Sequence, residues 1–258
     1  ASTVTTACPS RAMISAGVRG VGKVACLHSA PLRCDPALVD TLRAHDVVIG
    51  DLHTTWRHLA VHVGATHANA SMPSYLPPSL YARADMPPDF DHVMVRSGAL
   101  RLAMRQVKCL RSGTDHRSVI HRDGWCSDHV PVEAVWEKAG ARTRRLATWN
   151  VADPWYYARH AALQDARLAS NVVKGFSVLR EPARLADVHR VVIGLLERNA
   201  IVALQEVPSK IASALEEEAR RRGIHVEEST DRSTHDPGDE ADAPRVMLFV
   251  DRAELEDE

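Results

Sequence analysis

The stretch SDHVPVEAVWEKAGARTRRLATWNV, residues 127–151, contains two predicted strands separated by a short polar connector. The first strand, Val130–Trp136, is rich in β-branched residues and alternates in polarity. The second, Arg145–Val151, is predicted to be buried. The connector, Lys138–Arg144, is seven residues long and contains one glycine. A connection this short joins two strands only if their ends lie close together in space.

Apolar patterns on both sides of this stretch predict the remaining elements. Further strands are predicted at Lys23–His28, Val47–Gly50, Phe90–Val95, Ile201–Leu204 and Val246–Val250. Helices are predicted at Pro36–His45, Arg159–Lys174, Leu185–Arg198 and Lys210–Arg222. The segments Thr54–Asp89 and Ser229–Pro244 are expected to be variable loops. Because the strands and helices do not follow a strict βαβ rhythm, the pattern favours an α/β sandwich over a doubly wound sheet.

Length and composition are those of one globular domain spanning residues 1–258. Hydrophobic residues make up 45% of the 258 residues, and the formal net charge is −1. No overall basic field therefore points to a polyanionic partner. The five cysteines contain no CxxC pair, and no signal peptide or membrane-spanning run is recognisable. We therefore expect reduced thiols and a cytoplasmic or intracellular location, with no membrane partner.

Three weaker motifs have simpler explanations. Gly17–Lys23 (GVRGVGK) has the spacing of a phosphate-binding loop, but Val24 follows where Ser or Thr is needed, and the segment leads into a strand. His58 and His62 have a zinc-compatible spacing without the glutamate of a metalloprotease. In a chain with 14 histidines such pairs are expected by chance. The arginine-rich patches are most simply solvated surfaces.

Four strand ends carry polar side chains suited to metal-dependent chemistry. They are Gly50–His53, Ser127–His129, Thr148–Asn150 and Leu204–Glu206. A hard divalent cation prefers oxygen ligands, which Glu206, Asp128 and the Asn150 amide can supply. Hydrolysis of a phosphodiester also requires a carboxylate to orient water and donors around the phosphate. Each segment alone has a structural explanation in turn formation, but together they provide the full set.

These segments resemble the signature motifs of the endonuclease/exonuclease/phosphatase superfamily, whose members are metal-dependent phosphodiesterases with deoxyribonuclease I-like sites. The matching motifs are Thr-Trp-Asn at 148–150, Leu-Gln-Glu-Val at 204–207, Ser-Asp-His-x-Pro-Val at 127–132 and Gly-Asp at 50–51. Leu27–Pro31 is similar to the deoxyribonuclease I segment with a catalytic histidine, and Phe90–Val95 resembles the family's strand in which an aspartate precedes apolar residues. The resemblance covers about residues 20 to 252.

The order of the motifs implies a circular permutation. In the ordinary family the Trp-Asn strand comes first and the Ser-Asp-His strand last, whereas here the order is reversed. Residues 1–137 would then be the usual C-terminal half, 138–144 the new connector and 145–258 the usual N-terminal half. The resemblance implies a four-layer α/β sandwich in which two packed, mainly antiparallel sheets are flanked by helices. Opening a loop would preserve both halves of the site.

The resemblance also implies the roles of the carboxylates and the amide. Glu206, Asn150 and Asp128 would bind Mg²⁺ or Mn²⁺. Asp51 would orient the nucleophilic water. These assignments are transferred motif by motif from the family.

The histidines are assigned in the same way, with two departures from the family. His129, held by Asp91, would contact the scissile phosphate, and His28 would act on the leaving-group side. His53 stands where the family has asparagine, and an imidazole is larger and titrates near neutral pH. The acid that usually partners the leaving-group histidine is not evident, Asp242 being the nearest carboxylate before the last strand.

The leading hypothesis is a nuclease that hydrolyses DNA or RNA by in-line attack of water. Gly50–Trp56 is similar to retrotransposon endonucleases, and the long separation of Asn150 from Glu206 is similar to poly(A)-specific exonucleases. A phosphatase of inositol phosphates or phospholipids ranks lower because its longer motifs are missing. The non-enzymatic alternative is a catalytically degenerate domain with a structural or assembly role, for example as part of a larger polypeptide.

Overall fold

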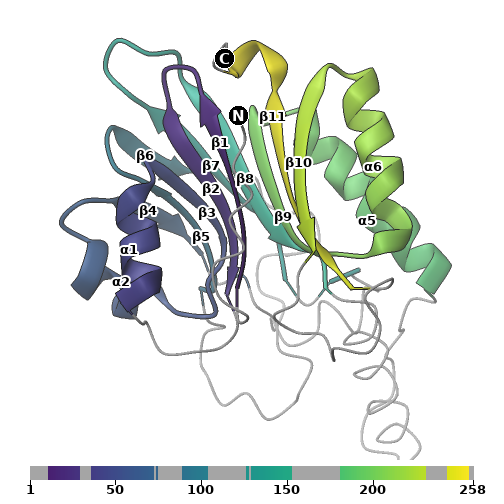
Figure 1. Cartoon of the computed structure of the whole chain (residues 1–258), viewed down its shortest axis with the longest axis horizontal. Helices are drawn as coiled ribbons and strands as arrows, with labels where there is room; N and C mark the ends of the chain where they lie inside the picture. The colour runs from purple at the N-terminus through teal and green to yellow at the C-terminus, as the bar shows by residue number, and fades with distance from the viewer. Residues whose placement is uncertain are drawn as a thin grey trace, which may run out of the picture.

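The computed structural model consists of two β-sheets packed face to face, with helices on both outer faces (Figure 1). It describes residues 11–29, 36–72, 74, 89–103, 126–127, 129–152, 181–230 and 243–255. In this part of the chain no helix is long and apolar enough to cross a membrane. The prediction of an α/β sandwich of two mainly antiparallel sheets is confirmed.

The first sheet has five strands in the order β1-β2-β3-β5-β4. They are β1 (Arg11–Val18), β2 (Gly22–Ser29), β3 (Val47–Asp51), β4 (Ala68–Ser71) and β5 (Asp91–Val95). Only β2 and β3 run parallel. Helices α1 (Pro36–Ala44) and α2 (Trp56–Val63) cover its outer face.

The second sheet has six strands in the order β10-β11-β9-β8-β7-β6. They are β6 (Ala99–Leu102), β7 (Val132–Glu137), β8 (Arg144–Asn150), β9 (Ile201–Val207), β10 (Ile224–Thr230) and β11 (Arg245–Asp251). Helices α5 (Glu181–Leu196) and α6 (Ser209–Arg221) cover its outer face, and a short 3₁₀ helix, η2 (Arg252–Glu254), follows β11. Only β8 and β9 run parallel.

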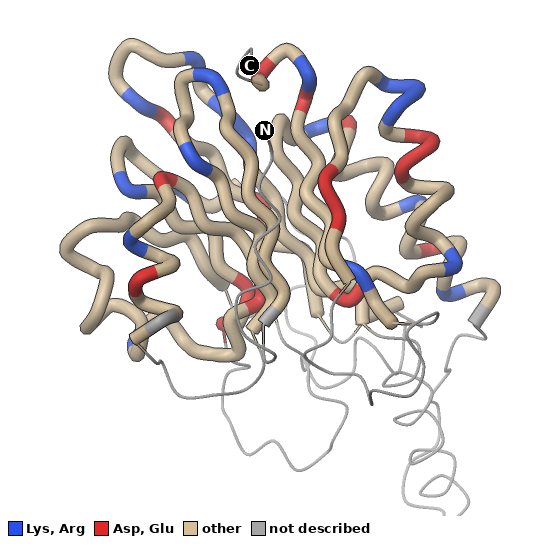
Figure 2. The backbone as a smooth tube through the Cα atoms, in the orientation of Figure 1, with Lys and Arg blue, Asp and Glu red and all other residues tan. Residues whose placement is uncertain are grey.

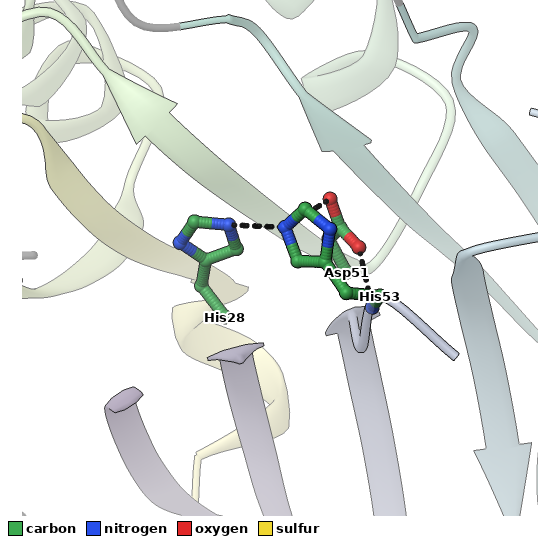
Figure 3. Close-up of side chains that lie close together, drawn as sticks. All are labelled: His28, Asp51 and His53. Carbon is green, nitrogen blue, oxygen red and sulfur yellow. Dashed lines mark hydrogen bonds and ion pairs between the residues drawn. The ribbon is translucent and has the colours of Figure 1, made fainter. Parts of the chain in front are cut away.

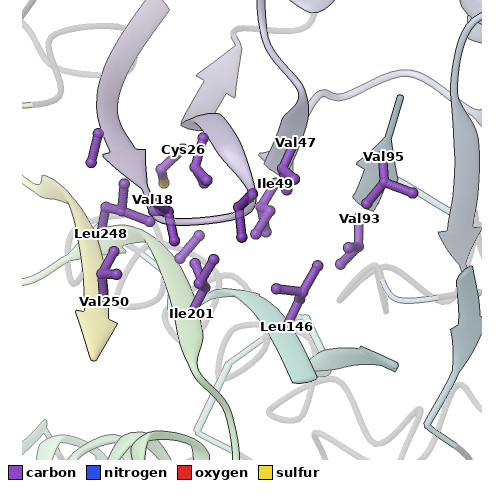
Figure 4. Close-up of a cluster of buried hydrophobic side chains, with 14 of the residues drawn as sticks. Val18, Cys26, Val47, Ile49, Val93, Val95, Leu146, Ile201, Leu248 and Val250 are labelled. Atoms are coloured by element: carbon purple, nitrogen blue, oxygen red, sulfur yellow. The ribbon is translucent and has the colours of Figure 1, made fainter. Parts of the chain in front are cut away.

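The largest apolar core lies between the two sheets (Figure 4). Alternate residues of each inner strand point into it, such as Val47 and Ile49 of β3 and Leu146 of β8. The residues between them face outward and pack under the helices, as Val48 does beneath α1 and α2. Strands buried on both faces explain why these segments are almost continuously apolar.

The two halves of the chain share one sheet and one core. Strands β7 and β8 form an antiparallel hairpin in which Trp136 pairs with Arg144, so the predicted connector is a hairpin loop. Arg144 is buried, and its guanidinium donates to the Glu254 carboxylate at 2.8 and 3.0 Å and to the Arg19 carbonyl at 2.9 Å. The hairpin is thereby fastened to η2 and to the turn after β1.

Several elements were missed by the sequence prediction. Strands β1, β4, β6 and β10 and helix α2 were not predicted. The predicted loop Thr54–Asp89 contains α2 and β4, and β10 includes the first residues of the predicted loop Ser229–Pro244. Most of these missed strands lie at sheet edges, are short or are partly exposed, so their apolar pattern is weak. The predicted helix Arg159–Lys174 lies outside the described residues.

The glycine-rich segment Gly17–Lys23 is the turn of the β1–β2 hairpin, in which Val18 pairs with Gly22. A strand precedes it, but a second strand follows instead of a helix. No helix N-terminus is therefore available there to hold phosphate. Lys and Arg occur at hairpin tips and along helices, interleaved with Asp and Glu (Figure 2), in keeping with the near-neutral net charge.

Gly50 allows β2 and β3 to approach closely enough to align the residues that follow. A Cβ atom at this position would lie 1.8 Å from the Leu27 carbonyl oxygen, and Gly50 has a φ of +154°. We predict that Gly50→Ala lowers the free energy of unfolding by about 3 kcal/mol through overpacking and backbone strain. Denaturant unfolding monitored by circular dichroism measures this change.

Gly194→Ala in α5 is the matched control, because its Cβ would meet only the end of the Arg198 side chain, at 3.0 Å, and no backbone atom. Helix propensity predicts a neutral to slightly stabilising effect there, up to about 1 kcal/mol. Equal losses in the two variants would contradict the role assigned to Gly50.

Candidate functional site

Polar side chains line one end of the core between the sheets. On four strands, the next inward-facing position beyond the apolar core residues is occupied by a polar residue. His28 follows Cys26 on β2, Asp51 follows Ile49 on β3, Asp91 precedes Val93 on β5 and Asn150 follows Thr148 on β8. Side chains two residues apart share a face of a strand, so all four turn inward. Pairing also aligns His28 with Asp51 and Asp51 with Asp91 across the first sheet.

The Asn150 amide bridges the two sheets. Its Nδ2 donates to Asp51 Oδ2 at 3.0 Å and to Glu206 Oε1 at 2.9 Å. Its Oδ1 accepts a hydrogen bond from the Ala152 N–H at 3.0 Å. Asn150 thus presents nitrogen to the carboxylates, whereas the sequence prediction had its oxygen as a metal ligand. Ionised carboxylates can only accept hydrogen bonds, so the Asn150 amide turns its donating nitrogen toward Asp51 and Glu206.

Glu206 reaches this cluster through a β-bulge. Strand β11 pairs Arg245 with Val207 and Met247 with Leu204, so Gln205 and Glu206 together oppose a single residue. Gln205 Nε2 lies 3.5 Å from Cys26 Sγ, while Glu206 Oε1 lies 3.4 Å from His28 Nε2. Without the bulge, consecutive residues would point to opposite faces, and Glu206 would point away from β2.

His129 and Asp91 form a buried pair. His129 Nδ1 lies 2.7 Å from Asp91 Oδ2, and its Nε2 lies 3.7 Å from Asp51 Oδ2. The Ser127 hydroxyl donates to the Asn150 carbonyl at 2.7 Å and accepts from the His129 N–H at 3.0 Å. The Trp149 indole donates to the His129 carbonyl at 3.0 Å. The Ser-Asp-His and Thr-Trp-Asn segments therefore hold each other in place.

His53 and His28 face each other beside Asp51 (Figure 3). Their Nε2 atoms are 3.3 Å apart, and His53 Nε2 lies 3.6 Å from Asp51 Oδ2. The His53 backbone N–H also donates to Asp51 Oδ1 at 2.9 Å. Burial lowers the pKa of His53, although the negative Asp51 partly opposes this shift.

Asp51 is fully buried yet favours its ionised form. Burial alone raises the pKa of a carboxyl group, but His53, His129 and His28 and the Asn150 hydrogen bond together lower the pKa of Asp51. A carboxylate in this environment is a competent base and ligand at neutral pH.

Backbone strain is concentrated at this site. Among the residues described, the non-glycine residues with positive φ are His53 at 46°, Ala152 at 66° and Glu206 at 53°. His53 and Ala152 lie two residues beyond the ends of β3 and β8, and Glu206 is the penultimate residue of β9. Left-handed backbone in residues with a Cβ costs free energy, and such residues are found where surrounding contacts enforce a functional geometry.

Arg184 of α5 supports the site and was not anticipated. It is fully buried, and its Nη1 lies within hydrogen-bonding distance of the carbonyls of Cys126, Val151 and Ala152, at 3.0 to 3.2 Å. It therefore ties the segment before Ser127 to the end of β8. An arginine in an amphipathic helix normally indicates an exposed face, so the sequence alone carries no signal for this role.

The structure brings together seven of the eight predicted site residues, and Asp128 lies outside the described part of the chain. Two sets of side chains have ligand atoms within 4.8 Å of one another, His28 with Asp51 and His53, and Asp51 with Asp91 and His129. These clusters could hold a metal ion. Asp51 Oδ2 and Glu206 Oε1 both accept from the Asn150 amide nitrogen, so these two carboxylates lie close together.

The two cysteines in the described residues, Cys26 and Cys126, are buried thiols outside any disulfide. Burial raises the pKa of the Cys126 thiol to about 12. A thiol of this kind is a packing residue and not a nucleophile.

Buried histidines should make the chain less stable in mild acid. Burial lowers the pKa values of His53, His67 and His92 below the ordinary 6.5. The unfolded chain then binds more protons than the folded chain below pH 6.5, so stability is full above that pH and falls as the pH decreases. We predict a lower free energy of unfolding at pH 5.5 than at pH 7.5, measured by denaturant titration.

The wild type loses free energy of unfolding as the pH falls from 6.5 to 5.5. The variant His53→Asn should make this loss smaller by at most about 1.4 kcal/mol. His58→Asn, at an exposed position of α2, is the control for the replacement of a surface histidine by asparagine. A wild-type chain that is equally stable at both pH values would contradict the assignment of neutral buried histidines.

Comparison with known proteins returned no match to a protein-family model, a curated protein or a solved structure. The geometry and chemistry of the chain's own residues therefore carry the functional argument.

Proposed function

We propose that this chain is a divalent-metal-dependent phosphodiesterase that cleaves a nucleic acid backbone by in-line attack of water. The observation that carries the proposal is the convergence of Asp51, Glu206 and Asn150 beside the His129–Asp91 pair. These residues come from both sheets and lie far apart in sequence. Structural capping explains individual residues but not the convergence of two carboxylates, an amide and a supported histidine.

Glu206 is the proposed ligand of Mg²⁺ or Mn²⁺, together with Asp128. The ion would supply charge neutralisation at the phosphate oxygens. Asp51 orients and deprotonates the attacking water, because the three surrounding histidines and the Asn150 amide keep its carboxylate ionised. Asn150 holds the carboxylates of Asp51 and Glu206 at a fixed separation, which is the positioning that hydrolysis requires.

The two histidines are proposed to act on the substrate. Asp91 accepts from His129 Nδ1, and Nε2, which is directed toward Asp51, would donate to a phosphate oxygen when the imidazole carries a proton on both nitrogens. His28 is proposed to protonate the leaving oxygen. Its Nε2 faces Glu206 and His53, so substrate binding would have to replace the His53 contact.

The proposed fold is a deoxyribonuclease I-like four-layer sandwich in permuted order. The support is the layer order of helices, sheet, sheet and helices, and the β7–β8 hairpin that joins the Ser-Asp-His and Thr-Trp-Asn segments. In the ordinary order these two strands would be the last and the first. Their adjacency makes a six-residue loop sufficient to join them.

A catalytically degenerate domain with an assembly role is the second candidate. It is favoured by one observation, the His53 imidazole beside Asp51 and His28, where the family motif has a smaller amide. In that case the buried polar cluster would remain as a structural element without turnover.

We predict Mg²⁺- or Mn²⁺-dependent hydrolysis of DNA or RNA oligonucleotides, or of a generic phosphodiester, that Glu206→Gln lowers by about 100-fold or more in kcat/KM. The substitution preserves shape and removes the charge needed for the cation. Glu137→Gln is the matched control on β7, because Glu137 is exposed and contacts Arg101. No metal-dependent hydrolysis, or equal rates for wild type and Glu206→Gln, would exclude the enzymatic function.

We further predict that His53→Asn increases kcat/KM several-fold in Mg²⁺. The shorter side chain removes the contact with His28 Nε2 and opens space for the phosphate beside Asp51. Steady-state kinetics on the same substrates measure the change. A lower rate in this variant would assign His53 a catalytic contribution of its own.

A further inference from the structure

The arrangement of His28 and His53 is unusual for a site that binds only magnesium. Their Nε2 atoms approach to 3.3 Å, and the rings are tilted by 45° with centroids 5.4 Å apart (Figure 3). Two imidazole nitrogens can approach in this way if one donates a hydrogen bond to the other. They can also both direct lone pairs at an ion placed between them.

Two carboxylates extend this pair into a possible coordination shell. His53 Nε2 lies 3.6 Å from Asp51 Oδ2, and His28 Nε2 lies 3.4 Å from Glu206 Oε1. The ligand atoms of His28, Asp51 and His53 all lie within 4.8 Å of one another. Zn²⁺ bonds of about 2.0 to 2.1 Å in a tetrahedron place neighbouring ligand atoms about 3.3 Å apart. The separations of 3.3 Å between His28 and His53, 3.4 Å between His28 and Glu206 and 3.6 Å between His53 and Asp51 are close to this value.

The donor types select the class of ion. Mg²⁺ strongly prefers oxygen ligands, whereas imidazole suits zinc and its first-row neighbours. His28 and Asp51 are fully buried, while the side chains of His53 and Glu206 retain 20% and 10% of their exposure. The cluster therefore has two fully buried ligands and two that remain partly exposed to solvent.

We propose that His28, Asp51 and His53 bind a divalent transition-metal ion of the zinc class, with Glu206 in reach as the fourth ligand. This site depends on His53 and is separate in ligand chemistry from the oxygen-liganded magnesium site. Its effect on catalysis rests on the proposed function: an ion held here occupies Asp51 and His28, and so inhibits the magnesium-dependent reaction.

The test is zinc binding to the metal-free full chain, measured by competition with a chromophoric chelator. We expect the wild type to bind one equivalent of Zn²⁺ that His53→Asn binds at least about tenfold more weakly. The double variant His58→Asn/His62→Asn is the matched control, because these exposed histidines lie one helical turn apart and could bind zinc adventitiously. It should retain the tight site. Equal affinity in the wild type and His53→Asn, or loss of the tight site in the control, would overturn the inference.

Circular dichroism and unfolding midpoints establish whether His53→Asn is folded. Co²⁺ binding to the wild type gives a second measurement that needs no variant, since tetrahedral Co²⁺ with nitrogen ligands absorbs strongly in the visible range. Displacement of that absorption by one equivalent of Zn²⁺ supports the site. A weak octahedral spectrum contradicts it.

Failure of this inference is distinguishable from failure of the proposed function. Tight zinc binding that depends on His53, in a chain that hydrolyses nothing in Mg²⁺, supports the zinc site and rejects the phosphodiesterase. Magnesium-dependent hydrolysis in a chain whose zinc affinity does not depend on His53 does the reverse. Zinc inhibition present in the wild type and reduced in His53→Asn supports both.

Discussion

The hydrogen bonds of one amide organise the polar end of this molecule. The carboxylates of Asp51 and Glu206 approach each other from different sheets, in surroundings where like charges repel strongly. Asn150 Nδ2 donates to both, and its oxygen is fixed by the Ala152 backbone. Since the amide has its two N–H groups on one nitrogen, it can satisfy both acceptors only when the sheets are in this register.

A cluster of this kind is stable because its members provide partners for one another. Burial of an unpaired carboxylate or imidazole is costly, whereas a connected network inside a low-dielectric core is strengthened. The apolar residues that continue each strand away from the site, such as Ile49 and Cys26, form the core that holds the two sheets together. Packing of the apolar core thus supplies the stability, and it also fixes the positions of the polar residues at the strand ends.

The sequence was informative where a strand's alternation continued into polar residues. Asp51 and Asn150 could be placed at strand ends because Val47–Ile49 and Leu146–Thr148 establish the phase of the pattern. Glu206 was identified as a strand end, but its orientation depends on a bulge that alternation does not predict.

Other features of the structure depend on tertiary contacts, so the local sequence around them did not predict them. Arg184 is buried because three carbonyls at loop ends require a donor, which is information distributed over distant segments. Strand β10 is partly exposed along its whole length and was missed because its residues do not alternate clearly. The direction of the Asn150 amide likewise depends on the positions of Asp51 and Glu206, which no local pattern contains.

The left-handed backbone at Glu206, with φ at 53°, has a consequence for how the chain tolerates change. Deleting one residue from the bulge would relax the strain and restore regular pairing with β11, so the strand itself would gain stability. The same deletion would rotate the carboxylate to the opposite face and leave Asn150 with a single acceptor. At this position, the regular pairing of the strand and the integrity of the polar cluster are in opposition.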